Sequence, residues 1–325
     1  MAELSYREAV AAGIAQEMRR DPDVLFLGED VAAAGGVFKT TEGLLDEFGP
    51  KRVKDTPISE QAIIGATMGA AMTGLRPIAE IMFSDFFAVC WDLVANQIAK
   101  TRYMTDGQCS FPLVIRSANG GGSRFGAQHS QSIENWAMAI PGLKVVAPST
   151  PADVKGLLAA SIRDPDPVMF FEDNNLAGTR GEVSEDEDFC IPFGQADIKR
   201  EGTDVTVVTI AGSLRPALVV ADEMESDGIS VEVIDPRTIV PLDTKTILDS
   251  VEKTGRLVVV DPAHQSCSVA SEISSIVSQE GFWSLQAPIQ RVTSLDCHFP
   301  FSPALEHLVF PNEDKIADAI RTTLE

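Results

Sequence analysis

The sequence lacks the features that mark membrane proteins and disulfide-rich secreted proteins. No apolar run approaches the roughly 18 residues that a membrane-spanning helix needs. The opening segment, MAELSYREAV, is polar and charged and has no signal-peptide pattern. The five cysteines form no CxxC pair, and their spacing does not indicate a disulfide framework. We therefore expect a cytoplasmic protein with reduced thiols.

Positive charge is also scarce. The chain has 26 Lys and Arg against 48 Asp and Glu, giving a net charge of −22. This balance argues against nucleic-acid binding, which depends on cationic side chains that release counterions. It is compatible with simple solubility or with a basic protein partner. Cys297 and His298, taken with His264 and Cys267, lack the usual spacing of zinc ligands.

The length and the order of the segments predict two α/β domains. At roughly 150 residues per domain, the 325-residue chain has room for two. Apolar, β-branched runs alternate with amphipathic stretches, a pattern typical of parallel sheets covered on both faces. The predicted strands span residues 23–30, 76–83, 112–119, 143–149, 167–173, 204–212, 229–235, 256–261 and 289–296. The predicted helices include residues 6–20, 151–164, 215–228 and 241–255.

One segment near the middle fits neither pattern. Residues 177–192, AGTRGEVSEDEDFCIP, are polar, acidic and glycine-containing. We interpret residues 177–196 as a linker between a first domain, 1–176, and a second domain, 197–325.

The predicted helix at 59–74 is unusually rich in small residues. It contains Gly65, Gly69 and Gly74 among several alanines, although each helical glycine costs about 1 kcal/mol relative to alanine. Either tight packing within the domain or the close approach of a ligand or partner explains this use of glycine. Glu60 is the carboxylate in its first turn, where a favourable interaction with the helix dipole is the simplest role.

A glycine-rich loop, NGGGSRFGAQHSQ at 119–131, follows a predicted strand. The carboxyl edge of strands in an open α/β sheet is where ligands bind. Gly120 to Gly122 resemble an anion nest, but no P-loop or GxGxxG motif is complete. His129 at the end of this loop is either a surface or structural residue or a catalytic one.

Taken together in order, many segments resemble the β subunits of the thiamine-diphosphate-dependent 2-oxo-acid dehydrogenase family. They cover nearly the whole chain. They are FLGEDV, DTPISEQAIIGATMGAAMTGLRPIAE, NQIAKTRYM, GAQHSQ, PGLKVVAPSTPADVKGLL, DPRTIVPLD, SVEKTGRLVVVD and FPFSPALEHLVFP. The resemblance implies an N-terminal pyrimidine-binding α/β domain and a C-terminal transketolase-like α/β domain.

The resemblance also implies that the cofactor is shared with a separate α subunit. The family holds the diphosphate and its Mg²⁺ through a GDG motif on the α subunit, and this chain has no GDG. Its task would be the aminopyrimidine end, where Glu60 matches the glutamate that binds ring nitrogen N1′ and favours the imino form. Ile58 matches a backbone contact to the pyrimidine. Met82 and Phe86 match residues that pack on the ring, although such side chains are usually core.

Further roles follow from the same resemblance. His129 matches a histidine that transfers protons near the reacting carbon and assists acyl transfer to lipoyl-lysine, chemistry that suits an imidazole near neutral pH. Some relatives bind K⁺ through backbone carbonyls at the positions of Leu113, Ser161, Asp164 and Asp166. The implied assembly is an α₂β₂ heterotetramer docked to a dihydrolipoyl acyltransferase core.

The substrate is left open among several alternatives. The segments CSVASEIS and SPALEHLVFP look like the acetoin dehydrogenase branch, which cleaves acetoin and passes an acetyl unit to lipoyl-lysine. Val89, Leu176-Ala177 and Pro262 depart from the commonest family pattern. The alternatives are a pyruvate or branched-chain 2-oxo-acid dehydrogenase, a transketolase-like half-enzyme, and a non-catalytic scaffold. Retention of both Glu60 and His129 argues against a scaffold.

Overall fold

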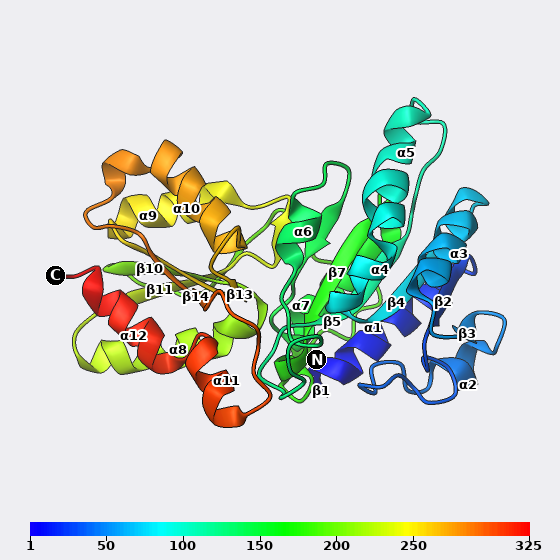
Figure 1. Ribbon diagram of the computed structural model, residues 1–325, viewed down its shortest axis with the longest axis horizontal. Helices are drawn as coiled ribbons and strands as arrows, with labels where there is room; N and C mark the ends of the chain where they lie inside the picture. The colour runs from blue at the N-terminus through cyan, green and yellow to red at the C-terminus, as the bar shows by residue number, and fades with distance from the viewer. The chain divides into compact units, whose positions relative to one another are not determined.

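The computed structural model describes residues 1–325, which divide into two compact units. Unit 1 consists of residues 1–119 and 136–193, and unit 2 of residues 120–135 and 194–325 (Figure 1). The segment 120–135 therefore groups with unit 2, although unit 1 flanks it in the sequence. No helix in either unit is long and apolar enough to cross a membrane.

A parallel sheet forms the centre of unit 1. Its strands lie in the order β6-β7-β5-β4-β2-β3, and each neighbouring pair is parallel. Every residue of β7 is buried, as expected where helices cover both faces. The five strands predicted for this part of the chain are confirmed, and β3 is an additional short one. The strands are β2 (Val24–Gly28), β3 (Val53–Asp55), β4 (Arg76–Phe83), β5 (Val114–Asn119), β6 (Lys144–Val146) and β7 (Val168–Asp173).

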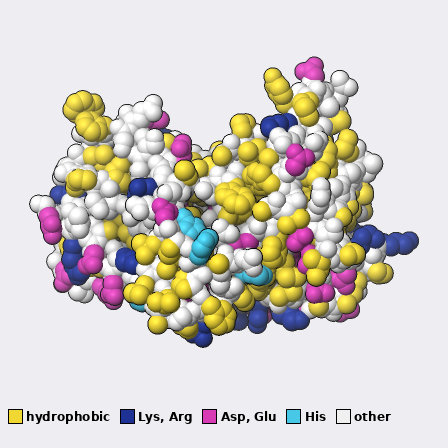
Figure 2. Space-filling model, viewed as in Figure 1, with side chains coloured by type: hydrophobic (Ala, Val, Ile, Leu, Met, Phe, Trp, Pro, Cys, Tyr) yellow, Lys and Arg dark blue, Asp and Glu magenta, His cyan; other side chains and the backbone are white.

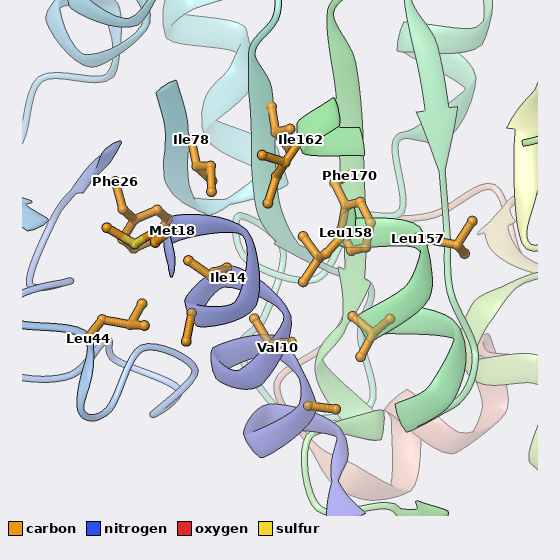
Figure 3. Packing of buried hydrophobic residues seen from close by; sticks show 14 of the residues in the cluster. Val10, Ile14, Met18, Phe26, Leu44, Ile78, Leu157, Leu158, Ile162 and Phe170 are labelled. Carbon is orange, nitrogen blue, oxygen red and sulfur yellow. The ribbon is translucent and has the colours of Figure 1, made fainter. Parts of the chain in front are cut away.

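Helices α1 (Tyr6–Arg20) and α7 (Pro151–Arg163) pack against each other in the core of unit 1. Their apolar side chains meet those of β2, β4 and β7 in one buried cluster (Figure 3). The helices approach closely because Gly13 has no side chain: a Cβ there would lie 3.2 Å from Leu158 Cδ1. Both begin with a side-chain cap. Ser5 and Glu8 form a capping box, and Thr150 accepts the N–H of Asp153 at 3.1 Å.

A second group of helices carries the small-residue segment. Helix α3 (Glu60–Met72) packs on β4 and β2. After β4, η1 (Ser84–Phe86) leads into a continuous helical arm formed by α4 (Phe87–Asp92), the π-helical η2 (Leu93–Ile98) and α5 (Ala99–Met104). Shorter helices complete the unit. They are α2 (Leu44–Phe48), α6 (Glu134–Met138, across the boundary with unit 2) and η3 (Asn174–Leu176).

The structure differs from the prediction over the segment interpreted as a linker. Strand β8 (Arg180–Val183) pairs antiparallel with β1 (Ala2–Ser5). Further on, Ile191 packs against α7, where a Cβ on Gly156 would lie 2.5 Å from Ile191 Cγ1. Residues up to Phe193 therefore belong to unit 1, held by strand pairing and by apolar contacts that its polar composition concealed.

Unit 2 is built on a sheet with the order β14-β13-β10-β11-β9. Three of its pairs are parallel, and β9 is antiparallel at one edge. The predicted strands and helices of this region are confirmed, and the two α/β units agree with the predicted fold class. The strands of this sheet are β9 (Asp197–Arg200), β10 (Val205–Thr209), β11 (Val231–Asp235), β13 (Leu257–His264) and β14 (Gln290–Ser294). Unit 2 also contains β12 (Thr238–Val240), a short strand that is not part of this sheet. The helices are η4 (Ala211–Ser213), α8 (Leu214–Ser226), α9 (Thr244–Thr254), α10 (Val269–Glu280), η5 (Phe282–Ser284), α11 (Pro303–Val309) and α12 (Glu313–Thr322).

Candidate active site

Glu60 is a nearly buried carboxylate at the start of helix α3. It is the first residue of α3, and the preceding Ser59 makes no side-chain cap. Ile63, Ile64 and Thr67 anchor the helix in the core, which fixes the position of its first turn. The Glu60 side chain is only 9% exposed, yet its carboxylate accepts no hydrogen bond from this chain. A nearly buried carboxylate without an internal partner is available to a ligand.

A second carboxylate, Glu29, is electrostatically coupled to Glu60. It follows β2, in the turn after Gly28, and is 8% exposed. Burial raises the pKa of Glu29, and the charges of Glu60 and Asp30 raise it further. Glu29 was not among the predicted site residues, although its place after a buried strand in FLGEDV was a usable signal. Burial and the charge of Glu60 likewise raise the pKa of Cys90 to about 12, which disfavours its thiolate near neutral pH.

The other predicted pyrimidine contacts also lie in unit 1. Ile58 is 81% exposed on the segment before α3. Met82, at the end of β4, and Phe86, in η1, are half-buried. The ring of Phe86 meets that of Phe83 edge-on at 6.0 Å. Unit 1 therefore contains Glu60, Ile58, Met82 and Phe86, the four residues assigned to the pyrimidine.

Met82 lines a cavity whose floor carries a buried ionic network. Arg116 on β5 donates hydrogen bonds from Nε and Nη2 to the carboxylate of Glu172 on β7, both at 2.7 Å, and a third to Glu80 on β4. Burial raises the pKa of Glu80 against the opposing effect of Arg116. Removing one partner of such a triad would leave a buried charge unpaired. No sequence pattern predicts this network, because its members lie on three separate strands.

His129 belongs to the other unit. It lies in the segment 120–135, is half-buried, and donates its backbone N–H to the carbonyl of Gly126 at 3.4 Å. Gly120 closes the base of the same loop by donating to the carbonyl of Gln131 at 3.0 Å. The two residues predicted to be catalytic are thus carried by different units, Glu60 by unit 1 and His129 by unit 2.

Two of the residues predicted to bind K⁺ already use polar groups inside unit 1. The Leu113 carbonyl accepts the N–H of Val168 at 3.0 Å. The hydroxyl of Ser161, which is fully buried, donates to the carbonyl of Leu157 at 2.7 Å. A cation at these positions would use the second lone pair of the Leu113 carbonyl and the carbonyl of Ser161.

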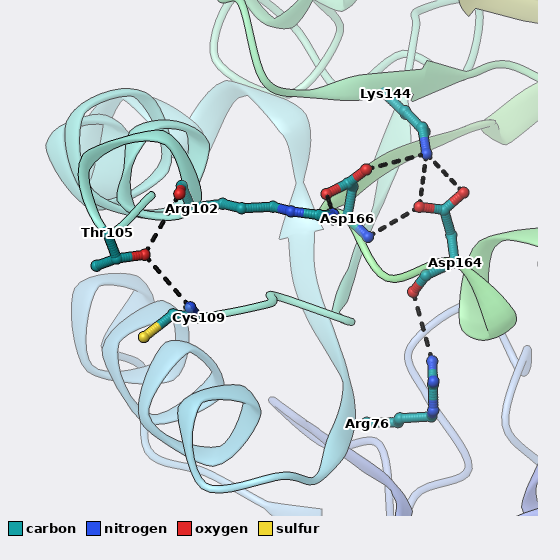
Figure 4. Close-up of polar contacts among 7 residues, drawn as sticks. All are labelled: Arg76, Arg102, Thr105, Cys109, Lys144, Asp164 and Asp166. Carbon is teal, nitrogen blue, oxygen red and sulfur yellow. Dashed lines mark hydrogen bonds and ion pairs between the residues drawn. The ribbon is translucent and has the colours of Figure 1, made fainter. Parts of the chain in front are cut away.

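The other two, Asp164 and Asp166, are paired with cations of the chain (Figure 4). Lys144 Nζ lies 2.6 Å from both carboxylate oxygens of Asp164, and Asp166 pairs with Arg102. Arg76 donates to the Asp164 carbonyl at 3.4 Å. These side chains carry no spare negative charge, so a monovalent cation here would depend on carbonyl oxygens alone. Across the chain, no group of three or more His, Cys, Asp or Glu side chains is arranged to hold a metal ion.

Comparison with known proteins decides the family. Residues 2–179 match the transketolase pyrimidine-binding domain, and residues 194–316 match the transketolase C-terminal domain. The chain is 48% identical to the acetoin:2,6-dichlorophenolindophenol oxidoreductase subunit beta of Bacillus subtilis (strain 168), covering 99% of this chain and 96% of that protein. It is 43% identical to the 2-oxoisovalerate dehydrogenase subunit beta of the same organism, over the full length of both.

This chain belongs to the β-subunit family of the thiamine-diphosphate-dependent 2-oxo-acid and acetoin dehydrogenases. Another member, the pyruvate dehydrogenase E1 component subunit beta of Rhizobium meliloti (strain 1021), is 46% identical over 99% of this chain and 70% of that protein. A solved structure described as a split gene transketolase, inactive beta4 tetramer, has a TM-score of 0.82. It covers 99% of this chain and 98% of its own, at 22% identity, and so supports the fold alone.

In this β subunit, one side of α3 is not covered by other parts of unit 1. Such an uncovered side is expected where a subunit packs against another. A Cβ on Gly69 would meet nothing within 4 Å, and one on Gly65 only Leu93 Cδ1 at 3.7 Å. Hydrophobic side chains also gather over the arm of α4 and α5 (Figure 2). Tyr103 in α5 is 90% exposed and Val89 in α4 is 57% exposed. Gly69 therefore does not serve packing within unit 1. An exposed apolar surface like that of the α4 and α5 arm is typical of an interaction site.

Proposed function

We propose that this chain is the β subunit of a dehydrogenase component that cleaves acetoin. The bond between the carbonyl and carbinol carbons breaks, and the carbinol half leaves as acetaldehyde. The acetyl half passes to one sulfur of a lipoyl-lysine disulfide. The proton of the carbinol hydroxyl ends on the other sulfur, which becomes a thiol. The disulfide thus takes up the two electrons. Two acetoin-type relatives that are 48% identical support this substrate over pyruvate or a branched 2-oxo acid, for which relatives are 46% and 43% identical.

The observation that carries the proposal is the Glu60 carboxylate, nearly buried at the start of α3 and without a partner in the chain. These residues fit the aminopyrimidine of thiamine diphosphate, which when bound supplies the electron sink for carbon–carbon cleavage. Glu60 would hold a proton at ring nitrogen N1′. The backbone of Ile58 and the side chains of Met82 and Phe86 would orient the ring and exclude water from it.

His129 would supply proton transfer for the second half-reaction. We assign it to the substrate oxygen and to the lipoyl thiol that forms as the acetyl group is transferred. An imidazole can give and take a proton near neutral pH, which suits both tasks. Its half-buried position in a backbone-bonded loop is compatible with this role.

The chain would also act together with protein partners. An α subunit would hold the diphosphate and Mg²⁺, since this chain has no GDG motif. The bare side of α3 and the exposed arm of α4 and α5 support an α₂β₂ heterotetramer. The net charge of −22 favours docking to a basic segment of a dihydrolipoyl acyltransferase core. K⁺ binding near Leu113 and a cytoplasmic location stay predictions.

Reconstitution with an α subunit tests the proposal. The assembled enzyme is assayed with acetoin, pyruvate and 2-oxoisovalerate, first with an artificial electron acceptor and then with lipoylated acyltransferase. We expect kcat/KM for acetoin to exceed the other two by at least about tenfold. Preference for a 2-oxo acid would make this a decarboxylating β subunit with the same Glu60 chemistry.

Calorimetry tests the division of the cofactor site. The purified chain, titrated with thiamine diphosphate and Mg²⁺, should bind weakly or not at all. Tight, Mg²⁺-dependent binding without an α subunit would contradict the proposed sharing of the cofactor.

A further inference from the structure

The glycine-rich loop that carries His129 forms an anion site, which is occupied by a carboxylate of the same chain. The backbone of this loop turns through the left-handed region, with φ of +80° at Gly120, +95° at Gly122 and +64° at Arg124. The N–H groups of Gly122 and Arg124 then converge on a single oxygen, Oε1 of Glu306, at 3.0 and 3.1 Å. Alternating N–H groups of this kind form a nest for an anion. The anion suggested by the sequence pattern is therefore a carboxylate from 184 residues further along the chain.

Glu306 is well placed to hold the loop. It lies on α11, inside unit 2, and is 5% exposed. A hydrogen bond from an amide to a charged, shielded carboxylate is among the stronger ones in proteins. Both donors meet the same oxygen, so the geometry demands one acceptor atom at this point.

Phe310, the residue after α11, holds the same loop through its shape. Its ring lies directly against Gly121, where a Cβ would be 1.9 Å from Phe310 Cζ. The ring is itself supported by Phe299, stacked at a centroid distance of 4.6 Å and an angle of 2°. A glycine is needed here, because a side chain at this position would overlap the end of the Phe310 ring. The α11 segment therefore contacts three residues of the loop: Phe310 packs against Gly121, and Glu306 accepts hydrogen bonds from Gly122 and Arg124.

We propose that Glu306 and Phe310 are positioning residues for His129. They fix residues 121–124, while the bond from Gly120 to Gln131 closes the base of the loop, so that the turn carrying His129 is held between two fixed points. The inference rests on the catalytic role proposed for His129. A purely structural role for α11 would affect stability but would not act through that imidazole.

Three variants of the assembled α₂β₂ enzyme separate these roles. Glu306→Leu removes the acceptor, and we expect kcat for acetyl transfer to lipoyl-lysine to fall at least tenfold. Glu306→Gln keeps one amide oxygen for both N–H groups and should retain activity within about threefold. Glu313→Leu, an exposed carboxylate on α12, is the matched control and should leave transfer unchanged. A Glu306→Gln variant as impaired as Glu306→Leu would overturn the proposal.

A double-mutant cycle tests whether the effect passes through His129. If Glu306 acts by positioning the imidazole, Glu306→Leu added to His129→Ala should lower the transfer rate by less than about twofold more. Independent, multiplying losses would refute the positioning role. If His129→Ala alone has no effect, the catalytic assignment fails instead.

Trypsin cleavage after Arg124 tests the loop itself, whatever the role of His129. Glu306→Leu should speed this cleavage at least tenfold, and Glu306→Gln should not. Phe310→Leu keeps the carboxylate and serves if Glu306→Leu does not assemble. It should speed cleavage and slow acetyl transfer together. A loop that is equally protected in wild-type enzyme and in Phe310→Leu would count against the proposal.

Discussion

Two glycine-rich regions of this chain use their missing side chains in opposite ways. On α3, a Cβ on Gly69 would meet nothing within 4 Å, so the chain itself leaves the space beside this glycine open. In the loop 120–126, the space over Gly121 is filled by Phe310, and the neighbouring N–H groups are satisfied by Glu306. The sequence shows both as runs of small residues. Only the structure distinguishes an open glycine surface from one that the chain has already filled.

The largest loss of activity is expected at α3, the helix whose glycine surface is open. Glu60→Gln should lower turnover of the assembled enzyme at least about 100-fold, in the range that acid–base groups contribute. The amide can still form a hydrogen bond with ring nitrogen N1′ but cannot hold a proton there as a carboxylate does. Circular dichroism and sedimentation should show an unchanged fold and assembly. A loss of only a few-fold would remove Glu60 from the mechanism.

The second region, the glycine-rich loop that is held by Phe310 and Glu306, is tested by His129→Ala. We expect transfer to lipoyl-lysine to be impaired at least as strongly as the first half-reaction, with a loss on the order of 10- to 100-fold, because an imidazole matters most where a thiol gains its proton. Stopped-flow measurement of the first step, alongside the overall rate with lipoylated acyltransferase, separates the two. An unchanged overall rate would leave His129 a structural role.

A pair of alanine substitutions compares the two regions directly. Gly121→Ala forces a methyl group against Phe310, and overpacking of this kind costs about 1–3 kcal/mol of unfolding free energy. Gly69→Ala meets nothing in the chain and removes a helical glycine, so the isolated chain should gain about 0.5–1 kcal/mol. Denaturant unfolding measures both. Binding of an α subunit should weaken only in Gly69→Ala; equal stability changes would erase the contrast.

The smallest expected effect is a pH-dependent change in Tm on substitution of Glu29, the carboxylate whose pKa is raised by Glu60 of α3. Its pKa is raised by burial and by Glu60, so the native state holds its proton more tightly than the unfolded chain. This contribution to stability is fully present below the unfolded pKa of about 4.5 and is lost as pH rises through the folded value. Glu29→Gln should therefore raise Tm relative to wild type at pH 7 more than at pH 4. Thermal scans at the two values check the sign.

Much of the fold was predictable because strands buried on both faces produce apolar runs and helices carry local caps. Strands such as β7 and helices such as α1 and α7 followed from these local rules. The pairing of β1 with β8 did not, because both strands are short, partly exposed and polar. Their register depends on contacts across the fold that no local pattern encodes.

The residues of the candidate site were likewise predictable where a local pattern marked them and not where only folding brought them together. Glu60 stood out because a carboxylate at the start of a small-residue helix is locally unusual. Glu29 and Arg116 did not, since their importance comes from partners on other strands. The nest at 120–124 was visible, but its anion was not, because Glu306 is distant in sequence. Proximity created by folding is the information that the sequence pattern lacked.

The distance between the nest and Glu306 also has a consequence for synthesis on the ribosome. Arg124 emerges 182 residues before the carboxylate that accepts its N–H. At 5–20 residues per second, the interval is roughly 10 to 40 s, long enough for a domain that folds as a unit to form. The contacts of the loop with Glu306 and Phe310 can form only near the end of translation. The segment carrying His129 therefore reaches its final form among the last parts of the nascent chain, and a truncated product that ends before α11 would contain Glu60 on a folded helix but not the held loop.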